Sequence, residues 1–229
     1  MEERWYDTYN ESWRIYDRFS ECEDFEDSAF TALLKHICFD GKTVYEYGCG
    51  TGKYTKKISE LCNELYANDI SPFMIERAQE RCANRSNIKY ITNSAENSGL
   101  ADESVDIIFG AWAGPPIWEK EIISKIEKEF SRILKKDGSI WLFANYLKGE
   151  FTQMRKLDEP LEPAAYFLNE LGMYGYTLVE VVPAYWNFSN LEEAKQVCNF
   201  IFGDNATAFF DKKGCPIMED NIGIFSRTK

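Results

Sequence analysis

Three glycines at alternate positions follow an acidic residue early in the chain, at Glu46, Gly48, Gly50 and Gly52. The apolar run before them predicts a strand, and the residues after them predict a helix. Glycine has no Cβ, so a glycine-rich turn lets the backbone come close to a bound ligand. A tight turn without a ligand is the alternative, but such a turn needs one glycine rather than three. The pattern therefore predicts a ligand-binding turn.

A second group that could hold a ligand is Asp69, twenty-one residues after Gly48. It ends the next predicted strand, where a carboxylate can accept charge-assisted hydrogen bonds from both hydroxyls of a ribose. An isolated aspartate is usually only a helix cap, and Ser71-Pro72 does predict a helix start here. The position of Asp69 relative to the glycines favours ligand binding over capping.

The spacing of the glycines argues against two other nucleotide sites. The dinucleotide fingerprint has its third glycine at the position that Lys53 occupies here, which disfavours NAD and FAD. The phosphate-binding P-loop needs Gly-Lys-Ser/Thr at a fixed distance from its first glycine, and the chain lacks that signature.

Strand-like and helix-like segments alternate from residue 43 onward, which predicts a parallel α/β sheet with helices on both faces. The predicted strands are 44–47, 64–68, 88–91, 105–109, 139–143, 176–182 and 222–227. The predicted helices are 28–38, the glycine turn to about 62, 72–84, 117–136, 160–171 and 190–202, the last with a capping box from Ser189 to Glu192. The residues before 28 are also expected to be helical.

Residues Val44 to Thr55 resemble motif I of class I, Rossmann-like S-adenosylmethionine-dependent methyltransferases. In that motif the acidic residue and the glycines hold the amino-acid and ribose parts of the cofactor. The resemblance thus implies cofactor contacts from Glu46, Gly48, Cys49 and Gly50.

The segment from Asp69 to Met74 resembles the second motif of the same family. This implies that Asp69 binds the ribose and that Ile70 and Met74 flank the adenine. Ser94-Ala95-Glu96 stands where the family commonly has an Asp-Ala-Glu-like turn at the adenine amino group. Because serine replaces the aspartate, the backbone of Ala95 or the serine hydroxyl would make this contact.

Residues 102–113 resemble the family's stretch through the fourth strand, which implies that Gly110, Ala111 and Trp112 lie beside the reactive sulfonium. Near the amino terminus, Ile15 to Phe19 resembles a "Y-D" element that brings a tyrosine, here Tyr16, to the cofactor's carboxylate. A purely structural role for Tyr16 is equally compatible with the sequence, because Trp5, Tyr9, Trp13 and Tyr16 share one predicted helix face. We expect residues 1–20 to form a lid.

The resemblance covers about residues 10–147 and implies a seven-stranded, mostly parallel sheet with a C-terminal antiparallel hairpin. A single domain over 1–229 is expected, with a helical lid at 1–40, a cofactor-binding core at 41–147 and C-terminal strands with a substrate cap at 148–229.

Methyl transfer from a sulfonium is a direct displacement, so positioning and exclusion of water matter more than a strong base. The sequence identifies no catalytic base. Aromatic rings attract a cationic sulfonium and pack a planar or apolar acceptor. The candidate acceptor-binding aromatics are Trp5, Tyr9, Trp112, Tyr146 and Trp186.

Composition narrows the acceptor and the partners. The formal net charge is −12, from 38 acidic and 26 basic residues, and such a field repels nucleic acid. The seven cysteines include no C-x-x-C pair, so neither a disulfide framework nor a metal site is predicted. Without a signal peptide or an apolar run near the ~20 residues that span a bilayer, a cytoplasmic protein without a membrane partner is expected.

We therefore predict S-adenosylmethionine-dependent methylation of a small molecule. The alternatives are a protein that binds the cofactor without catalysis and a methyltransferase acting on protein or nucleic acid. The latter should show a basic groove or an Asn-Pro-Pro-Tyr tetrad. Gly114-Pro115-Pro116-Ile117 lacks the polar first and aromatic fourth residue of that tetrad.

Overall fold

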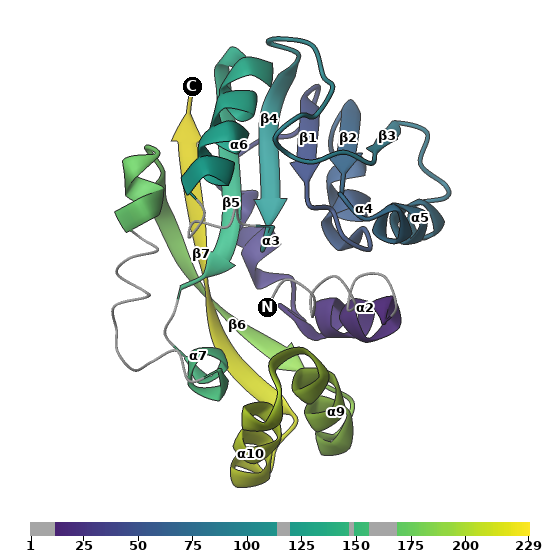
Figure 1. The fold of residues 1–229 in the computed structure, drawn as a ribbon, viewed down its shortest axis with the longest axis vertical. Helices are drawn as coiled ribbons and strands as arrows, with labels where there is room; N and C mark the ends of the chain where they lie inside the picture. The colour runs from purple at the N-terminus through teal and green to yellow at the C-terminus, as the bar shows by residue number, and fades with distance from the viewer. Residues whose placement is uncertain (1–11, 114–119, 147–148, 156–168) are drawn as a thin grey trace. The chain divides into compact units, whose positions relative to one another are not determined.

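The computed structural model describes residues 12–113, 120–146, 149–155 and 169–229 (Figure 1). The chain divides into two compact units. Unit 1 consists of Met1–His36, Asn145–Leu168 and Glu180–Gly223, and unit 2 consists of Ile37–Ala144, Asn169–Val179 and Ile224–Lys229. The expected single domain with a lid, a core and a cap stays a prediction.

The strands form one mixed sheet of seven strands in the order β3-β2-β1-β4-β5-β7-β6 (Figure 1). Strands β1 to β5 run parallel, and β6 and β7 form an antiparallel hairpin at the end of the chain. This confirms the predicted sheet. The strands are β1 Thr43–Tyr47, β2 Glu64–Asn68, β3 Ile88–Ile91, β4 Val105–Ala111, β5 Leu134–Asn145, β6 Thr177–Asn187 and β7 Ile217–Thr228.

The helices of unit 2 are α4 Lys53–Ser59, α5 Pro72–Arg81 and α6 Lys120–Ile133, and residues 169–173 are also helical. Helix α5 starts as predicted, because Ser71 caps it through a hydrogen bond from the Met74 N–H at 3.4 Å and Pro72 occupies its first turn. Helix α4 packs against β2 and α5.

Successive side chains of β1 show that helices cover both faces of the sheet. Tyr45 and Tyr47 pack on Phe130 of α6, with ring centroids 6.3 and 4.8 Å apart. Glu46 instead contacts α4, where its Oε2 accepts a hydrogen bond from Thr55 Oγ1 at 2.6 Å. Because neighbouring strand residues point to opposite faces, α6 and α4 lie on opposite faces of β1.

Strand β5 begins earlier than the sequence predicts. We expected a turn at Gly138 before a strand over 139–143, but Leu134 already pairs with Val105, and Ser139 pairs with Ile107. Between these pairs β4 advances two residues and β5 advances five, so β5 bulges out of register here. A Cβ on Gly138 would lie 2.6 Å from Leu134 Cδ1, so glycine is what permits the bulge.

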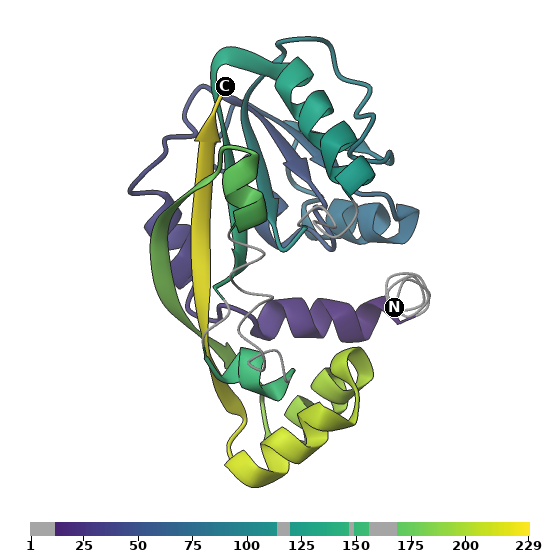
Figure 2. The same cartoon turned by 60° about the vertical axis from the view of Figure 1, so that its left-hand side comes forward.

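Unit 1 contains five helices among its described residues, α2 Trp13–Cys22, α3 Ser28–Leu33, α7 Glu150–Met154, α9 Leu191–Phe202 and α10 Asp204–Lys213. Helix α2 packs along α9, as Figure 2 shows. Its buried residues are Phe19 and Cys22, with Ile15 packed beside them. This face is offset from the predicted aromatic stripe, whose members Trp13 and Tyr16 are only half-buried.

The carboxyl-terminal helices also differ from the prediction. The N-cap of α9 is Asn190, whose Oδ1 accepts a hydrogen bond from the Glu193 N–H at 2.9 Å, so the expected box from Ser189 is shifted by one residue. Helix α10 was not predicted, although Gly214 ends it in the left-handed conformation that is typical of helix ends.

Candidate functional site

The predicted ligand-binding residues of unit 2 follow the carboxyl ends of four adjacent parallel strands. The glycine turn follows β1, Asp69 follows β2, Ser94 follows β3 and Trp112 follows β4. The register pairs Tyr47 with Asn68 and Asn68 with Ile91, which places these strand ends side by side. Ligands of parallel sheets bind at this edge.

A hydrogen bond joins the two strongest sequence signals. Asp69 Oδ2 accepts the N–H of Gly50 at 2.9 Å, and Asp69 Oδ1 accepts the N–H of Ser71 at 2.9 Å. Asp69 therefore acts as a local turn residue and also ties the glycine turn to β2. Each carboxylate oxygen has a further lone pair, so the group can still accept ligand hydroxyls. Burial raises the pKa of Asp69, against the opposing effect of these backbone hydrogen bonds.

The glycines of the turn take left-handed conformations, with φ of +63° at Gly48, +54° at Gly50 and +85° at Gly52. A Cβ on Gly48 would lie 2.3 Å from Ala113 Cβ, and one on Gly52 would lie 2.9 Å from Ala78 Cα in α5. At these two positions glycine is therefore required by packing inside the protein. The sequence interpretation assigned that need to the ligand.

Glu46 is a buried carboxyl group beneath the turn. Its Oε2 accepts the Thr55 hydroxyl proton at 2.6 Å. The pKa of Glu46 is raised to about 8, mainly by burial, with the hydrogen bond from Thr55 acting against this rise and the charge of Asp69 adding to it. Near neutral pH the side chain thus carries a proton and can donate as well as accept a hydrogen bond.

The carboxyl end of β4 carries a strained aromatic residue. Trp112 has φ +50°, a conformation that bulky residues rarely adopt. Its ring lies 6.1 Å from both Tyr54 and Phe143, and its backbone N–H donates to the Phe143 carbonyl at 3.0 Å. Within the described residues its indole Nε1 has no hydrogen-bond acceptor. The neighbouring Gly110 leaves room for the ring of Tyr47, which a Cβ would approach to 2.2 Å.

The other predicted cofactor contacts differ in how accessible they are. Ile70 is 71% exposed, whereas Met74 is 1% exposed and offers no surface to an adenine in this structure. Cys49 is buried, and burial raises the pKa of its thiol. Ser94, Ala95 and Glu96 form a partly exposed turn in which Ser94 Oγ accepts the Glu96 N–H at 3.3 Å.

Five predicted residues belong to unit 1, and the structure describes three of them. Tyr16 is half-buried on α2, and the Tyr146 N–H donates to the Asn221 carbonyl at 2.8 Å. Trp186 is 1% exposed, with its ring stacked at 5.2 Å on Phe151, so it lies in the core of unit 1 rather than on a surface. The predicted wall residues Trp5 and Tyr9 lie outside the described residues.

Sequence reasoning missed two residues that shape this edge of the sheet. Asn68 Nδ2 donates to the carbonyls of Ile91 at 3.2 Å and Asn93 at 2.8 Å, which fixes the loop after β3 against β2. Tyr54 packs beneath Trp112 from the first turn of α4. In the sequence these residues are an asparagine at the end of a predicted strand and a tyrosine shortly after the glycine turn.

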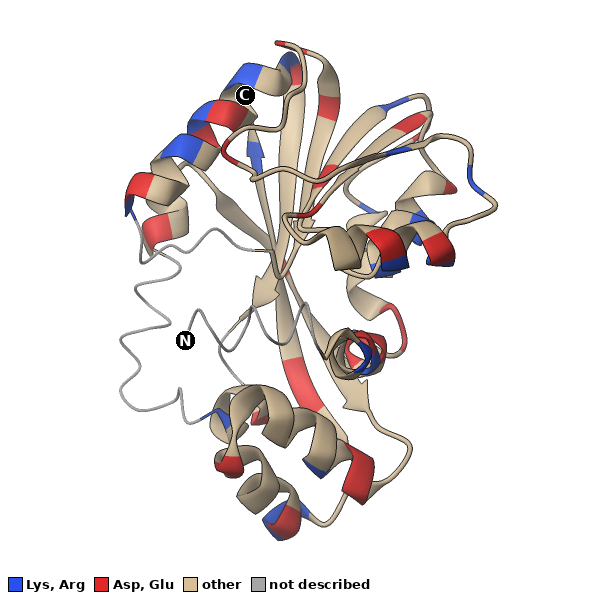
Figure 3. Cartoon of the chain, turned by 45° about the vertical axis from the view of Figure 1, so that its right-hand side comes forward, with Lys and Arg blue, Asp and Glu red and all other residues tan. Residues whose placement is uncertain are grey.

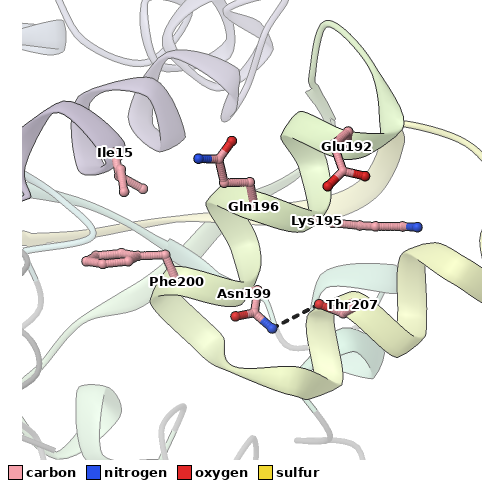
Figure 4. A pocket seen from close by; sticks show the side chains of 7 residues that line it. All are labelled: Ile15, Glu192, Lys195, Gln196, Asn199, Phe200 and Thr207. Carbon is pink, nitrogen blue, oxygen red and sulfur yellow. Dashed lines mark hydrogen bonds between the residues drawn. The ribbon is translucent and has the colours of Figure 1, made fainter.

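Two hollows are lined by none of the residues at this edge. One, of about 380 Å³, lies on α9 and α10 of unit 1 and includes Asn199, hydrogen-bonded to Thr207, and Phe200 (Figure 4). The other, of about 360 Å³, lies in unit 2 near Lys42 and Gly138, before β1 and within β5. Neither contains a predicted ligand-binding residue, so we place the candidate site by its chemistry and not by these hollows.

The described residues show neither a metal-binding cluster nor a membrane-spanning helix. They contain no group of three or more His, Cys, Asp or Glu side chains placed to hold a metal ion. No helix in that part of the chain is both long and apolar enough to cross a membrane.

Comparison with known proteins matches residues 44–138 to the family described as "Methyltransferase domain". An uncharacterized methyltransferase of Geobacillus sp. (strain WCH70) is 27% identical over 183 residues, which are 79% of this chain and 83% of that protein. A malonyl-[acyl-carrier protein] O-methyltransferase of Anoxybacillus flavithermus (strain DSM 21510 / WK1) is 32% identical over 126 residues. That match covers 53% of this chain and 46% of the relative, so it spans about half of the relative's length.

Among solved structures, the crystal structure of the YcgJ protein from Bacillus subtilis has the same fold. The TM-score is 0.60 at 18% sequence identity, and the match covers 89% of this chain and 98% of that one.

Proposed function

We propose that this chain, whose residues 44–138 match the methyltransferase domain, uses S-adenosylmethionine to methylate a small-molecule acceptor by direct displacement. One observation carries the proposal. The Asp69 carboxylate accepts the Gly50 N–H at 2.9 Å. A carboxylate that could bind a ribose therefore lies directly beside the glycine turn, at the carboxyl edge of a parallel sheet.

The residues at this edge fit the cofactor. Asp69 has lone pairs for ribose hydroxyls, and the exposed Ile70 offers an apolar surface to the adenine. The protonated Glu46 orients the turn through Thr55. The Ser94 turn would contact the adenine edge. When bound, S-adenosylmethionine supplies an electrophilic methyl group on a positively charged sulfur.

Trp112 is our candidate for positioning the methyl group and the acceptor. Its strained backbone fixes the indole at the end of β4, and such strain is often found at functional sites. An aromatic face attracts a cationic sulfonium, and an indole Nε1 without an acceptor among the described residues can donate to a polar acceptor. We assign no general base.

A small acceptor is favoured over nucleic acid. The formal charge of −12 opposes polyanion binding. Basic and acidic side chains alternate along α6 of unit 2, so this helix forms no basic stripe (Figure 3). The name of the Anoxybacillus relative gives malonyl-[acyl-carrier protein], an acceptor carried on a protein, and assaying it tests the alternative to a free small molecule.

The test is calorimetric titration of the full chain with S-adenosylmethionine, S-adenosylhomocysteine and NAD. We expect saturable binding of the first two ligands and none of NAD. Binding of NAD alone would refute the proposal. Release of S-adenosylhomocysteine that depends on an added acceptor distinguishes an enzyme from a protein that only binds the cofactor.

A further inference from the structure

A shielded arginine, Arg155, follows helix α7 in unit 1. Its guanidinium carbon lies 5.4 Å from the ring centroid of Phe151 and 5.2 Å from that of Phe202. Burial lowers the pKa of Arg155, and the charge of Asp220 acts against this. Two aromatic rings thus hold a partly desolvated cation in place.

Two described carboxylates of unit 1, Glu150 and Asp220, already have other partners. Glu150 pairs with Lys213 and also accepts the Glu219 N–H at 2.8 Å. Asp220 accepts hydrogen bonds from Asn145 Nδ2 at 2.8 Å, Trp186 Nε1 at 3.4 Å and the N–H of the next residue at 2.8 Å. Among the described residues the Arg155 guanidinium contacts the two aromatic rings and feels the charge of Asp220, but it makes no hydrogen bond or ion pair with them.

A second polar group on α7 also lacks a partner. Thr152 is 2% exposed, and its Oγ1 makes no hydrogen bond to any described residue. Residues three apart on a helix lie on adjoining faces, so Thr152 and Arg155 project from the same side of α7. Burying a polar group without a hydrogen-bond partner lowers the stability of the folded chain, and a ligand that hydrogen-bonds to the group offsets this loss.

We propose that Arg155 and Thr152 form an oxyanion site that binds a carboxylate or phosphate group of the methyl acceptor. The planar guanidinium can donate two parallel hydrogen bonds to such a group, and the threonine hydroxyl can donate a third. Helix α7 begins at Glu150, shortly after β5 ends at Asn145. Assigning the anion to the acceptor rests on the proposed function, whereas anion binding itself does not.

The experiment is titration of the full chain with sodium malonate and, separately, with inorganic phosphate at constant ionic strength. We expect saturable binding of one probe, and its identity distinguishes a carboxylate site from a phosphate site. Arg155→Met should weaken this binding at least about tenfold, and the nearly isosteric Thr152→Val should weaken it less. Arg18→Met is the matched control, because Arg18 of unit 1 already pairs with Glu193 Oε1 at 2.7 Å.

Absence of saturable binding by the wild-type chain overturns the proposal, as does equal binding by wild type and Arg155→Met when both melt at the same temperature. If Arg155→Met unfolds, Thr152→Val decides by the same criterion. S-adenosylhomocysteine titrated into the same samples separates the two hypotheses. Cofactor binding without anion binding overturns only this site, and anion binding without cofactor binding overturns only the proposed function.

Discussion

Asp69 is the residue whose loss should affect the cofactor most directly. Asp69→Ala removes a carboxylate that can bind ribose hydroxyls and also the acceptor for the Gly50 N–H. Hydrogen bonds to a charged group are worth ~1.5–3 kcal/mol, so we expect S-adenosylhomocysteine to bind at least about tenfold more weakly in calorimetry.

A matched aspartate in the same unit controls for this prediction. Asp106 on β4 also accepts a backbone hydrogen bond, from the Thr43 N–H at 2.9 Å, and pairs with Lys135, yet it lies away from the carboxyl edge. Asp106→Ala should lower stability and leave the affinity of the folded chain unchanged. Equal losses of affinity in the two variants would remove Asp69 from the site.

Glu46 should make stability depend on pH. Its pKa of about 8 in the folded chain exceeds the ordinary value of 4.5, so the folded chain holds a proton that the unfolded chain releases. This contribution to stability is complete below pH 4.5 and is lost as the pH rises to about 8.

The test compares Glu46→Gln with the wild type in thermal melts from pH 5 to 9. Glutamine keeps an oxygen that accepts the Thr55 hydroxyl proton but has no ionisable proton. The melting temperature of the variant relative to wild type should rise from pH 5 to about 8 and then level off. Asp220, whose pKa burial raises to about 6, titrates in both proteins and cancels in the difference. A difference that is constant with pH contradicts the shift.

At the scale of elements, the approach of α4 to α5 depends on Gly52. Gly52→Ala combines a left-handed backbone with a Cβ 2.9 Å from Ala78 Cα. Gly41→Ala is the matched control, since Gly41 has φ +69° but nothing within 4 Å of the new Cβ. Urea unfolding should show a loss of about 1 kcal/mol for Gly41→Ala and ~1–3 kcal/mol more for Gly52→Ala. Equal losses of unfolding free energy in the two variants would show that α5 moves away from the new Cβ without further destabilising the chain.

Truncation of the amino-terminal residues distinguishes a lid over the site from a packing role. A chain that begins at Ser12 lacks only Trp5, Tyr9 and their neighbours, and we expect weaker S-adenosylhomocysteine binding with an unchanged melting temperature. A chain that begins at Glu21 also loses Phe19, whose ring lies 4.3 Å from Trp186, so its melting temperature should fall. Unchanged affinity in the first variant would exclude residues 1–11 from any lid.

The elements that the sequence predicted well are those with local signals. The apolar runs of β1 to β4 and the Ser71-Pro72 helix start needed no knowledge of the partner elements. The bulge at Gly138 depends instead on pairing with β4, and pairing register is not encoded in a single segment.

The same distinction holds for the candidate site. The glycine turn and Asp69 could be identified from the sequence, because each directly follows a predicted strand. Met74 was expected beside the adenine, but α5 turns it inward with Ile75 and Ala78. Arg155 was missed because α7 has five residues, too few to leave a periodic pattern.

At the scale of the whole molecule, the net charge predicts that polyanions are excluded. We expect no saturable binding of a fluorescently labelled single-stranded RNA in anisotropy measurements at about 50 mM salt, where contacts to phosphate groups are strong. S-adenosylhomocysteine binding by the same sample is the positive control. Saturable RNA binding that weakens steeply with salt would contradict the small-molecule proposal.

The packing of Gly48 against Ala113 and of Gly52 against Ala78 also predicts which residues persist in homologues that have lost their activity. Both glycines are fixed by neighbouring protein atoms, so natural selection on folding alone would retain them in a descendant that had lost its ligand. Folding constrains Asp69 less strictly, because its bonds from the Gly50 and Ser71 N–H groups need only a short side chain with an acceptor oxygen, which asparagine also has. We therefore expect degenerate descendants to keep the glycines and to vary at the aspartate, which makes the aspartate the better marker of an active homologue.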